Sequence, residues 1–117
     1  MMGPNQNFII IYITYKDMTE AKKVAEALLR DHLIACVNYF PIESAYWWPT
    51  SATLRPGEKG KVEKCKEIVS LIKTRTENWD KVRTAVEALH PYEVPCIMKL
   101  DVTANESYVN WIYKETE

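Results

Sequence analysis

The chain of 117 residues is long enough to bury one core, so it needs neither disulfides nor a structural metal to fold. Its 15 basic and 16 acidic side chains leave a formal net charge of −1, which argues against nucleic acid as the main partner, because phosphate binding requires a basic face. No apolar run approaches the roughly 20 residues that span a bilayer, and residues 8–13 have no basic lead and no cleavage site of a signal peptide.

The chain begins with a predicted strand and a predicted helix. Residues 1–7 are polar and suggest a loose tail. Residues 8–14 are β-branched and aromatic without alternation, which is typical of a strand covered on both faces. Asp17 or Thr19 then offers a helix cap, and apolar side chains at helical spacing extend the helix to about Asp31.

The second predicted strand, over residues 35–48, indicates an oligomer. Pro41 has no amide hydrogen to donate, so the strand lies at an edge of the sheet or is bulged there. Neighbouring side chains of a strand point to opposite faces, so the domain's own helices cannot cover all of Tyr46, Trp47 and Trp48. A long aromatic edge left in water favours aggregation, and we therefore expect another chain to cover it.

The remaining elements follow in a regular order. They are a loop over residues 49–60, a strand over 61–74, a helix capped near Thr76, a strand over 96–102 and a short terminal helix capped by Asn105. The loop holds two prolines and two glycines, and the second helix stops at His90 because a residue before proline avoids the helical region.

The order β-α-β-β-α-β with a final helix predicts one α+β domain of the ferredoxin-like class over residues 1–117. Right-handed crossovers place the first and third strands in the centre of the sheet and the second and fourth at its edges. The first and third strands hold the densest apolar runs, which agrees with central positions. The three cysteines are an odd number at wide spacing, so we expect reduced thiols and a cytoplasmic location.

Several short segments, in order along the chain, resemble the CutA family of divalent-cation tolerance proteins. They are Ile34-Ala35-Cys36-Val37-Asn38, Tyr46-Trp47-Trp48, Gly60-Lys61-Val62-Glu63 with Glu67, Lys73-Thr74-Arg75, His90-Pro91-Tyr92-Glu93-Val94-Pro95 and Tyr108-Val109-Asn110-Trp111. The resemblance covers residues 9–115 and implies a ferredoxin-like fold, a stable homotrimer, no established catalytic activity and a link to tolerance of copper and other divalent metals. The family trimer is also similar to that of the PII signalling proteins, which bind small molecules in clefts between subunits.

The chain departs from the family pattern in two places. Family members join the tryptophan of the YWW segment to the Gly-Lys pair by a much shorter link, so residues 49–60 contain a hairpin-tip insertion. The copper ligands proposed for bacterial members are a cysteine at the end of the first strand and two adjacent histidines before the proline. The matching positions here are Ile13 and Leu89-His90, so His90 is the one ligand that remains.

His90, Glu93 and Cys96 form a candidate metal site, because each side chain can bind copper or zinc. In an extended chain residues three apart lie about 10 Å from one another, so these three share an ion only if Pro91 and Pro95 bend the chain. The alternative is that His90 ends the second helix at its negative end and that Cys96 packs as a small apolar side chain. We expect no cofactor to be required for folding.

A second candidate site is a polar and aromatic cleft between subunits. Its residues are Tyr46, Trp48, Lys61, Glu63, Glu67 and Lys73. The alternative for the charged members is a solvated face of a strand pair. The chain has no nucleophile with a partnered base and no phosphate-binding glycine loop, so we expect no enzyme activity.

These observations predict a non-enzymatic homotrimer of divalent metal (copper) tolerance, which binds metal weakly or acts as a scaffold. The alternative is a PII-like sensor that binds a small molecule in the cleft between subunits. Neither nucleic acid nor a membrane is expected as a partner.

Overall fold

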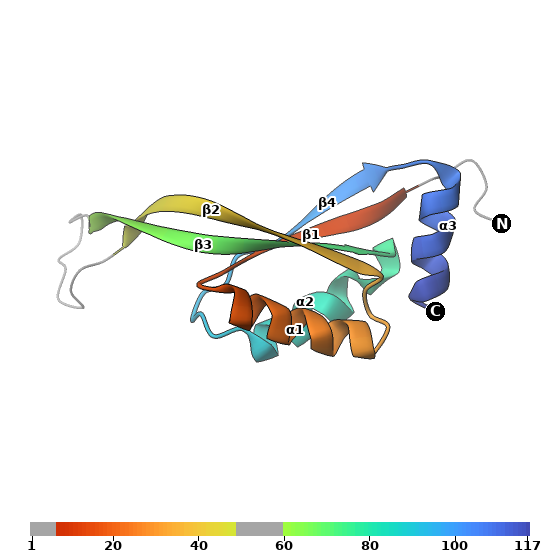
Figure 1. Ribbon diagram of the computed structural model, residues 1–117, viewed down its shortest axis with the longest axis horizontal. Coiled ribbons are helices and arrows are strands. Elements are labelled where there is room, and N and C mark those ends of the chain that lie inside the picture. Colours follow the sequence, from red (N-terminus) through yellow and green to blue (C-terminus); the bar gives the residue numbers. More distant parts are fainter. Residues whose placement is uncertain (1–6, 49–59) are drawn as a thin grey trace.

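The computed structural model describes residues 7–48 and 60–117 (Figure 1). The tail predicted over residues 1–7 and the hairpin-tip insertion predicted over residues 49–60 lie outside this part of the chain, apart from one residue of each. Asn7 does not belong to a tail, because it is the first residue of a strand and pairs with Thr103.

The elements follow the predicted order. They are β1 (Asn7–Tyr15), α1 (Met18–Arg30), β2 (Cys36–Trp48), β3 (Lys61–Thr74), the 3-10 turn η1 (Thr76–Asn78), α2 (Trp79–Leu89), β4 (Ile97–Thr103) and α3 (Glu106–Glu115). The strands form one antiparallel sheet in the order β2-β3-β1-β4. This order confirms the ferredoxin-like α+β fold with an added C-terminal helix, and it confirms β1 and β3 as the central strands. Among the described residues no helix is long and apolar enough to cross a membrane.

Helix α1 has well-defined ends. Asp17 is its N-cap, because a side-chain oxygen of Asp17 accepts a hydrogen bond of 2.9 Å from the backbone N–H of Glu20. At the other end His32 has a left-handed backbone, with φ of 55°. The N–H groups of His32 and Leu33 turn back to carbonyl oxygens of the last helical turn, which is the arrangement of a Schellman motif.

The caps of the other two helices differ from the prediction. Thr76 begins the η1 turn, and α2 starts only at Trp79. The amide group of Asn78, which precedes α2, donates to Leu33 O at 3.0 Å instead of capping the helix. Asn105 is the N-cap residue of α3, but its side chain donates to Ser107 Oγ rather than accepting from the backbone.

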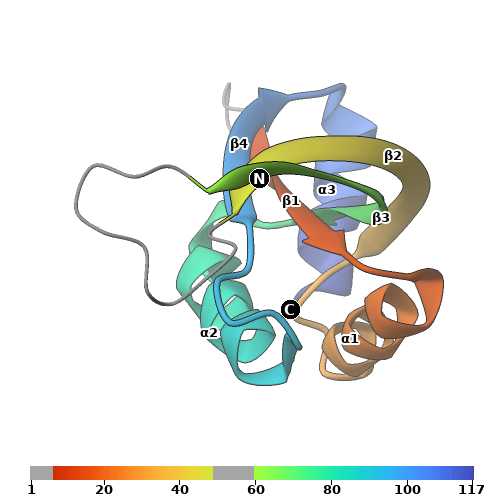
Figure 2. The same cartoon turned by 90° about the vertical axis from the view of Figure 1, so that its left-hand side faces the viewer.

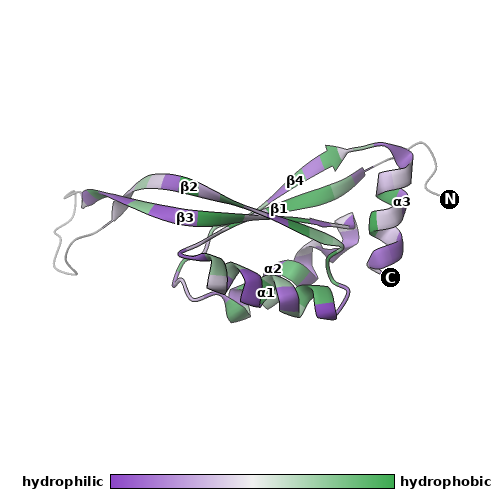
Figure 3. Cartoon of the chain, viewed as in Figure 1, coloured by the Kyte–Doolittle hydropathy of each residue, from purple (hydrophilic) through white to green (hydrophobic). Residues whose placement is uncertain are grey.

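One face of the sheet carries the main core. Helices α1 and α2 lie side by side against this face (Figures 1 and 2). The buried side chains of this core come from alternate positions of β1 and from the inner sides of the two helices; they include Ile9, Ile11, Ile13, Val24, Leu28, Val82 and Val86. Strand β1 and the middle of β3 are the most apolar parts of the sheet (Figure 3).

The opposite face, here called the open face, is covered by α3 at one end. Val109 and Ile112 of α3 pack on Phe8, so β1 is covered on both faces at that end. Further along, apolar side chains of four strands share this face by register, and they include Ile10, Tyr12, Phe40, Leu71, Met98 and Leu100. Phe40 of β2 and Met98 and Leu100 of β4 are 37%, 50% and 49% exposed, whereas no residue of β1 is exposed, which agrees with the predicted cover of β1 on both faces.

Strands β2 and β3 continue past the rest of the sheet. The pairing of β1 with β3 ends at Tyr15 and Ile68, so residues 42–48 and 61–67 form a two-stranded ribbon, here called the arm. The arm projects beyond both helical layers (Figure 1). Isolated two-stranded ribbons are marginally stable in water, and Trp47 and Trp48 at its end are 66% and 51% exposed. The outer end of the arm, around Trp47 and Trp48, is therefore the least covered part of the sheet in this single chain.

Candidate functional site

A pocket of about 650 Å³ lies where the arm meets the segment between α2 and β4, and it is here called the arm pocket. Its walls come from the end of β1, from both strands of the arm and from that segment. The lining residues are Thr14, Lys16, Tyr46, Trp48, Glu63, Cys65, Lys66, Glu67, Tyr92, Glu93, Val94 and Cys96.

The alternation of side chains along the arm places one set of polar and aromatic groups in the pocket. Tyr46 pairs with Glu63 across the two strands, and Ser44 pairs with Cys65, so these residues share one face of the ribbon. The rings of Tyr46 and Trp48 meet edge to face, with centroids 6.2 Å apart and an interplanar angle of 88°. The thiol of Cys65 lies 3.9 Å from the Tyr46 hydroxyl.

His90 anchors the segment that closes the pocket. Its ring is buried, and Nε2 lies 2.8 Å from the carbonyl oxygen of Thr14 while Nδ1 lies 3.1 Å from the backbone nitrogen of Tyr92. An amide N–H can only donate, so Nδ1 accepts and the proton sits on Nε2, which donates to Thr14. The ring also stacks on Tyr15, with centroids 4.5 Å apart. Both nitrogens of the neutral imidazole are therefore engaged within the chain.

The carbonyl of Thr14 lies where β1 no longer pairs with β4. The pairing of β1 with β4 ends at Ile13 and Ile97, so the carbonyl of Thr14 lies just past the last strand neighbour. His90 supplies the missing donor. Burial lowers the pKa of His90 and outweighs the hydrogen bond to Thr14 and the charges of Glu20 and Glu67, which act in the opposite direction.

Tyr92 connects the anchored segment to the arm. Its hydroxyl donates a hydrogen bond of 2.8 Å to Oε2 of Glu67. Burial and then this carboxylate raise the pKa of Tyr92, so the phenol stays protonated. Burial and the charge of Glu67 also raise the pKa of Cys96, which keeps this thiol in its weakly reactive protonated form. All three cysteines of the chain are free.

The structure places the candidate metal ligands in different surroundings within one chain. Glu93 and Cys96 line the arm pocket, whereas His90 points both ring nitrogens at backbone groups of its own chain. Over residues 7–48 and 60–117 no three His, Cys, Asp or Glu side chains form a group able to hold an ion. Ile13, at the position of the family's cysteine ligand, is fully buried in the core. The His90 ring lies against Tyr15 and Thr14 of β1.

The candidate cleft residues separate into two groups. Tyr46, Trp48, Glu63 and Glu67 line the arm pocket, whereas Lys61 and Lys73 do not. Lys61 pairs with Trp48 at the far end of the arm. Lys73 lies at the opposite end of β3, where its ammonium group is 5.5 Å from the centre of the Tyr108 ring. Within one chain Lys61 and Lys73 therefore lie at opposite ends of β3, and the cleft between subunits stays a prediction.

Sequence reasoning missed several members of the pocket. Lys16, Cys65 and Tyr92 come from three distant segments and show no common pattern in the sequence. The sequence could have pointed to Tyr92, because it lies between Pro91 and Pro95 in a segment that resembles the CutA family.

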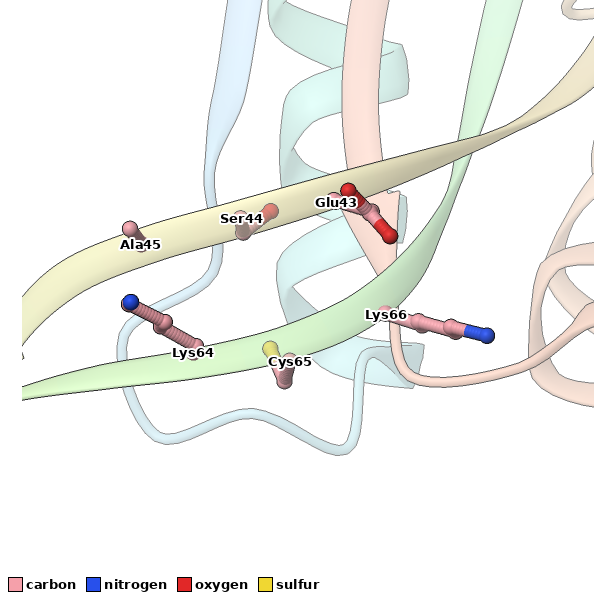
Figure 4. A pocket seen from close by; sticks show the side chains of 6 residues that line it. All are labelled: Glu43, Ser44, Ala45, Lys64, Cys65 and Lys66. Atoms are coloured by element: carbon pink, nitrogen blue, oxygen red, sulfur yellow. The ribbon is translucent and has the colours of Figure 1, made fainter.

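A second hollow lies along the arm (Figure 4). It has a volume of about 390 Å³ and is lined by Glu43, Ser44, Ala45, Lys64, Cys65 and Lys66. The side chains of Lys64 and Lys66 extend away from each other on either side of Cys65 (Figure 4). This hollow has no aromatic wall, so the arm pocket is the better candidate for a ligand.

Comparisons with known proteins agree on one family. The family model described as CutA1 divalent ion tolerance protein matches residues 9–115. The divalent-cation tolerance protein CutA of Pyrococcus horikoshii is 38% identical over 110 residues, which cover 93% of this chain and 98% of that protein. The chloroplastic protein CutA 1 of Oryza sativa is 34% identical over 110 residues, which cover 92% of this chain and 56% of that protein. The solved structure of the periplasmic divalent cation tolerance protein CutA from Archaeoglobus fulgidus superimposes with a TM-score of 0.83 at 36% identity and covers 94% of this chain and 99% of that one.

Proposed function

The chain belongs to the CutA1 divalent ion tolerance protein family, and from this premise we propose that it acts in metal tolerance, including tolerance of copper, as a non-enzymatic homotrimer. Its role is that of a scaffold that binds metal weakly. Three free thiols agree with a reducing compartment such as the cytoplasm. The proposed partners are two further copies of the chain, without nucleic acid or a membrane.

The apolar open face is the observation that carries the proposal of an oligomer. Phe40, Met98 and Leu100 expose large apolar surface on one side of the sheet, and Trp47 and Trp48 are exposed on opposite faces of the arm. Burying a side chain of this kind contributes about 1.5–3 kcal/mol. A second copy that carries the same face and the same arm covers both, and the trimeric number follows the family resemblance.

The oligomer is tested by native mass spectrometry and light scattering of the full chain, where we expect the mass of three chains. Met98→Lys and Leu100→Lys place charges on the open face and should shift the mass toward one chain. Leu29→Lys is the matched control, because Leu29 is 37% exposed on α1 and lies away from the open face. A wild-type monomer at micromolar concentration would contradict the proposal.

Weak metal binding is supported by the geometry of His90, whose two ring nitrogens are both engaged. Titration of copper into the wild-type protein, followed by calorimetry, should give binding that His90→Ala leaves unchanged. Cys96→Ser is titrated in parallel with His90→Ala, because Cys96 lines the arm pocket and His90 does not. Tight stoichiometric binding that disappears with His90→Ala would overturn this part of the proposal.

A second candidate function rests on the arm pocket. Its volume of about 650 Å³ lies within the range of about 300–1,000 Å³ that is typical of small-molecule sites, and aromatic rings form part of its wall. This supports the alternative of a sensor similar to the PII proteins, which holds a small molecule at the base of the arm. A thermal-shift screen of metals against nucleotides and small organic ions tests it, and a rise in melting temperature with an organic compound is the expected result.

A further inference from the structure

We propose that the arm pocket binds small organic cations, with an alkylated ammonium group seated against the rings of Tyr46, Trp48 and Tyr92. The carboxylates of Glu63 and Glu67 supply the opposite charge. This inference rests on the second candidate function, because it names the class of ligand for the same pocket.

The aromatic walls are the first part of the argument. Tyr46 and Trp48 stand two residues apart on β2, so both point to the same side of the ribbon, and their rings form a right-angled corner. Tyr92 adds a third ring from the segment between α2 and β4. The faces of aromatic rings attract cations, and several rings around one ammonium group are the usual recognition site of alkylated ammonium ligands.

The third wall is held in place before any ligand arrives. The Tyr92 hydroxyl is bonded to Glu67, its backbone N–H is bonded to His90, and its ring lies against the imidazole at a centroid distance of 4.8 Å. His90 is itself bonded to Thr14 of β1. A wall fixed at three points loses little conformational entropy on binding, which favours affinity for a small ligand.

The charges of the pocket favour a cation over an anion. Three carboxylates, of Glu63, Glu67 and Glu93, stand against the two ammonium groups of Lys16 and Lys66. Cys65 is the main cause that raises the pKa of Tyr46, and the charges of Glu67 and Glu63 add to this effect.

The pKa values of Tyr92 and Cys96 are also raised. Burial raises the pKa of Tyr92 and of Cys96, and Glu67 raises both further. Each ionisable group that perturbs these side chains makes a new negative charge less favourable. The carboxylate of Glu67 therefore disfavours a further negative charge beside Tyr92 and Cys96.

The proposal is tested with choline and with its uncharged carbon analogue dimethylbutanol, each titrated into the full-length protein and followed by tryptophan fluorescence and calorimetry. Because the two compounds have the same shape, their difference measures the charge. We expect choline to bind at least about 10-fold more tightly than dimethylbutanol. Benzoate and inorganic phosphate serve as anionic probes, and we expect neither to bind as tightly as choline.

Two variants assign the binding to named groups. Trp48→Leu removes one wall, and because Trp48 is 51% exposed the variant should fold. Glu67→Gln removes the charge but keeps a carbonyl oxygen that accepts from the Tyr92 hydroxyl. Each should weaken choline binding about 5-fold or more. Trp111→Leu is the matched control, because Trp111 is 41% exposed on α3 and does not line the pocket.

The outcomes separate the inference from the function on which it rests. Equal binding of choline and dimethylbutanol, tighter binding of an anion, or choline binding unchanged in both Trp48→Leu and Glu67→Gln would overturn the cation proposal while leaving a ligand-binding pocket. If neither the organic ions nor nucleotides bind, the sensor function falls together with the cation proposal. The mass of the oligomer and the copper titration, measured on the same samples, report on the metal-tolerance scaffold separately.

Discussion

Replacing His90 by alanine tests whether this residue is an anchor of the fold or a metal ligand. The substitution removes two hydrogen bonds and a ring that stacks on Tyr15. Each hydrogen bond contributes roughly 1 kcal/mol net, and the stacked pair contributes about 0.5–1.5 kcal/mol. The Thr14 carbonyl and the Tyr92 N–H also lose their partners, and the ring leaves a cavity. We therefore expect His90→Ala to lower the free energy of unfolding by about 3–5 kcal/mol.

Urea unfolding of metal-free protein, followed by circular dichroism at one fixed chain concentration, measures this loss. The fixed concentration matters because the stability of an oligomer depends on it. His90→Gln should lie between the wild type and His90→Ala, since its amide restores a donor for Thr14 but no ring. Leu89→Ala is the control, because Leu89 is 47% exposed and should cost less than about 1 kcal/mol. A loss below about 1 kcal/mol for His90→Ala would refute the anchor argument.

Three further predictions concern the same anchor and the ends of α1. Because burial lowers the pKa of His90 below its usual 6.5, the unfolded chain binds more protons than the folded chain below that pH. Stability should therefore decrease as the pH falls below about 6.5, and His90→Gln should flatten this dependence in pH-resolved melting curves. Asp17→Ala should cost about 1 kcal/mol while Thr19→Ala costs little, because Asp17 makes the capping bond; equal losses in urea unfolding would contradict the assignment. His32→Gly should be about 1 kcal/mol more stable than His32→Ala, since glycine accepts the left-handed backbone; a more stable alanine variant would show that His32 does not keep this conformation in solution.

Much of the fold was predictable because its signals are local. The uniformly apolar β1, the proline in β2 and the Pro91 that stops α2 each act through neighbouring residues, and β3 was placed at its observed bounds. The cap of α3 was harder. Asn105 has a nearby hydroxyl, on Ser107, that competes for its side chain, and the sequence does not show which bond forms.

The sequence by itself determined the order of elements, the central and edge strands, and the family, because hydrophobic periodicity, turn residues and short motifs are properties of neighbouring positions. Only the tertiary structure decided the roles of the candidate site residues. His90 became an anchor because Thr14, 76 residues away, lies past the last residue of β1 that pairs with β4. Lys73 lies beside Tyr108 and away from the arm pocket because it stands at the other end of β3, and Tyr92 lines the pocket while Glu67 accepts from its hydroxyl. Hydrogen-bond partners of this kind depend on distances between remote segments, which packing of the whole chain sets.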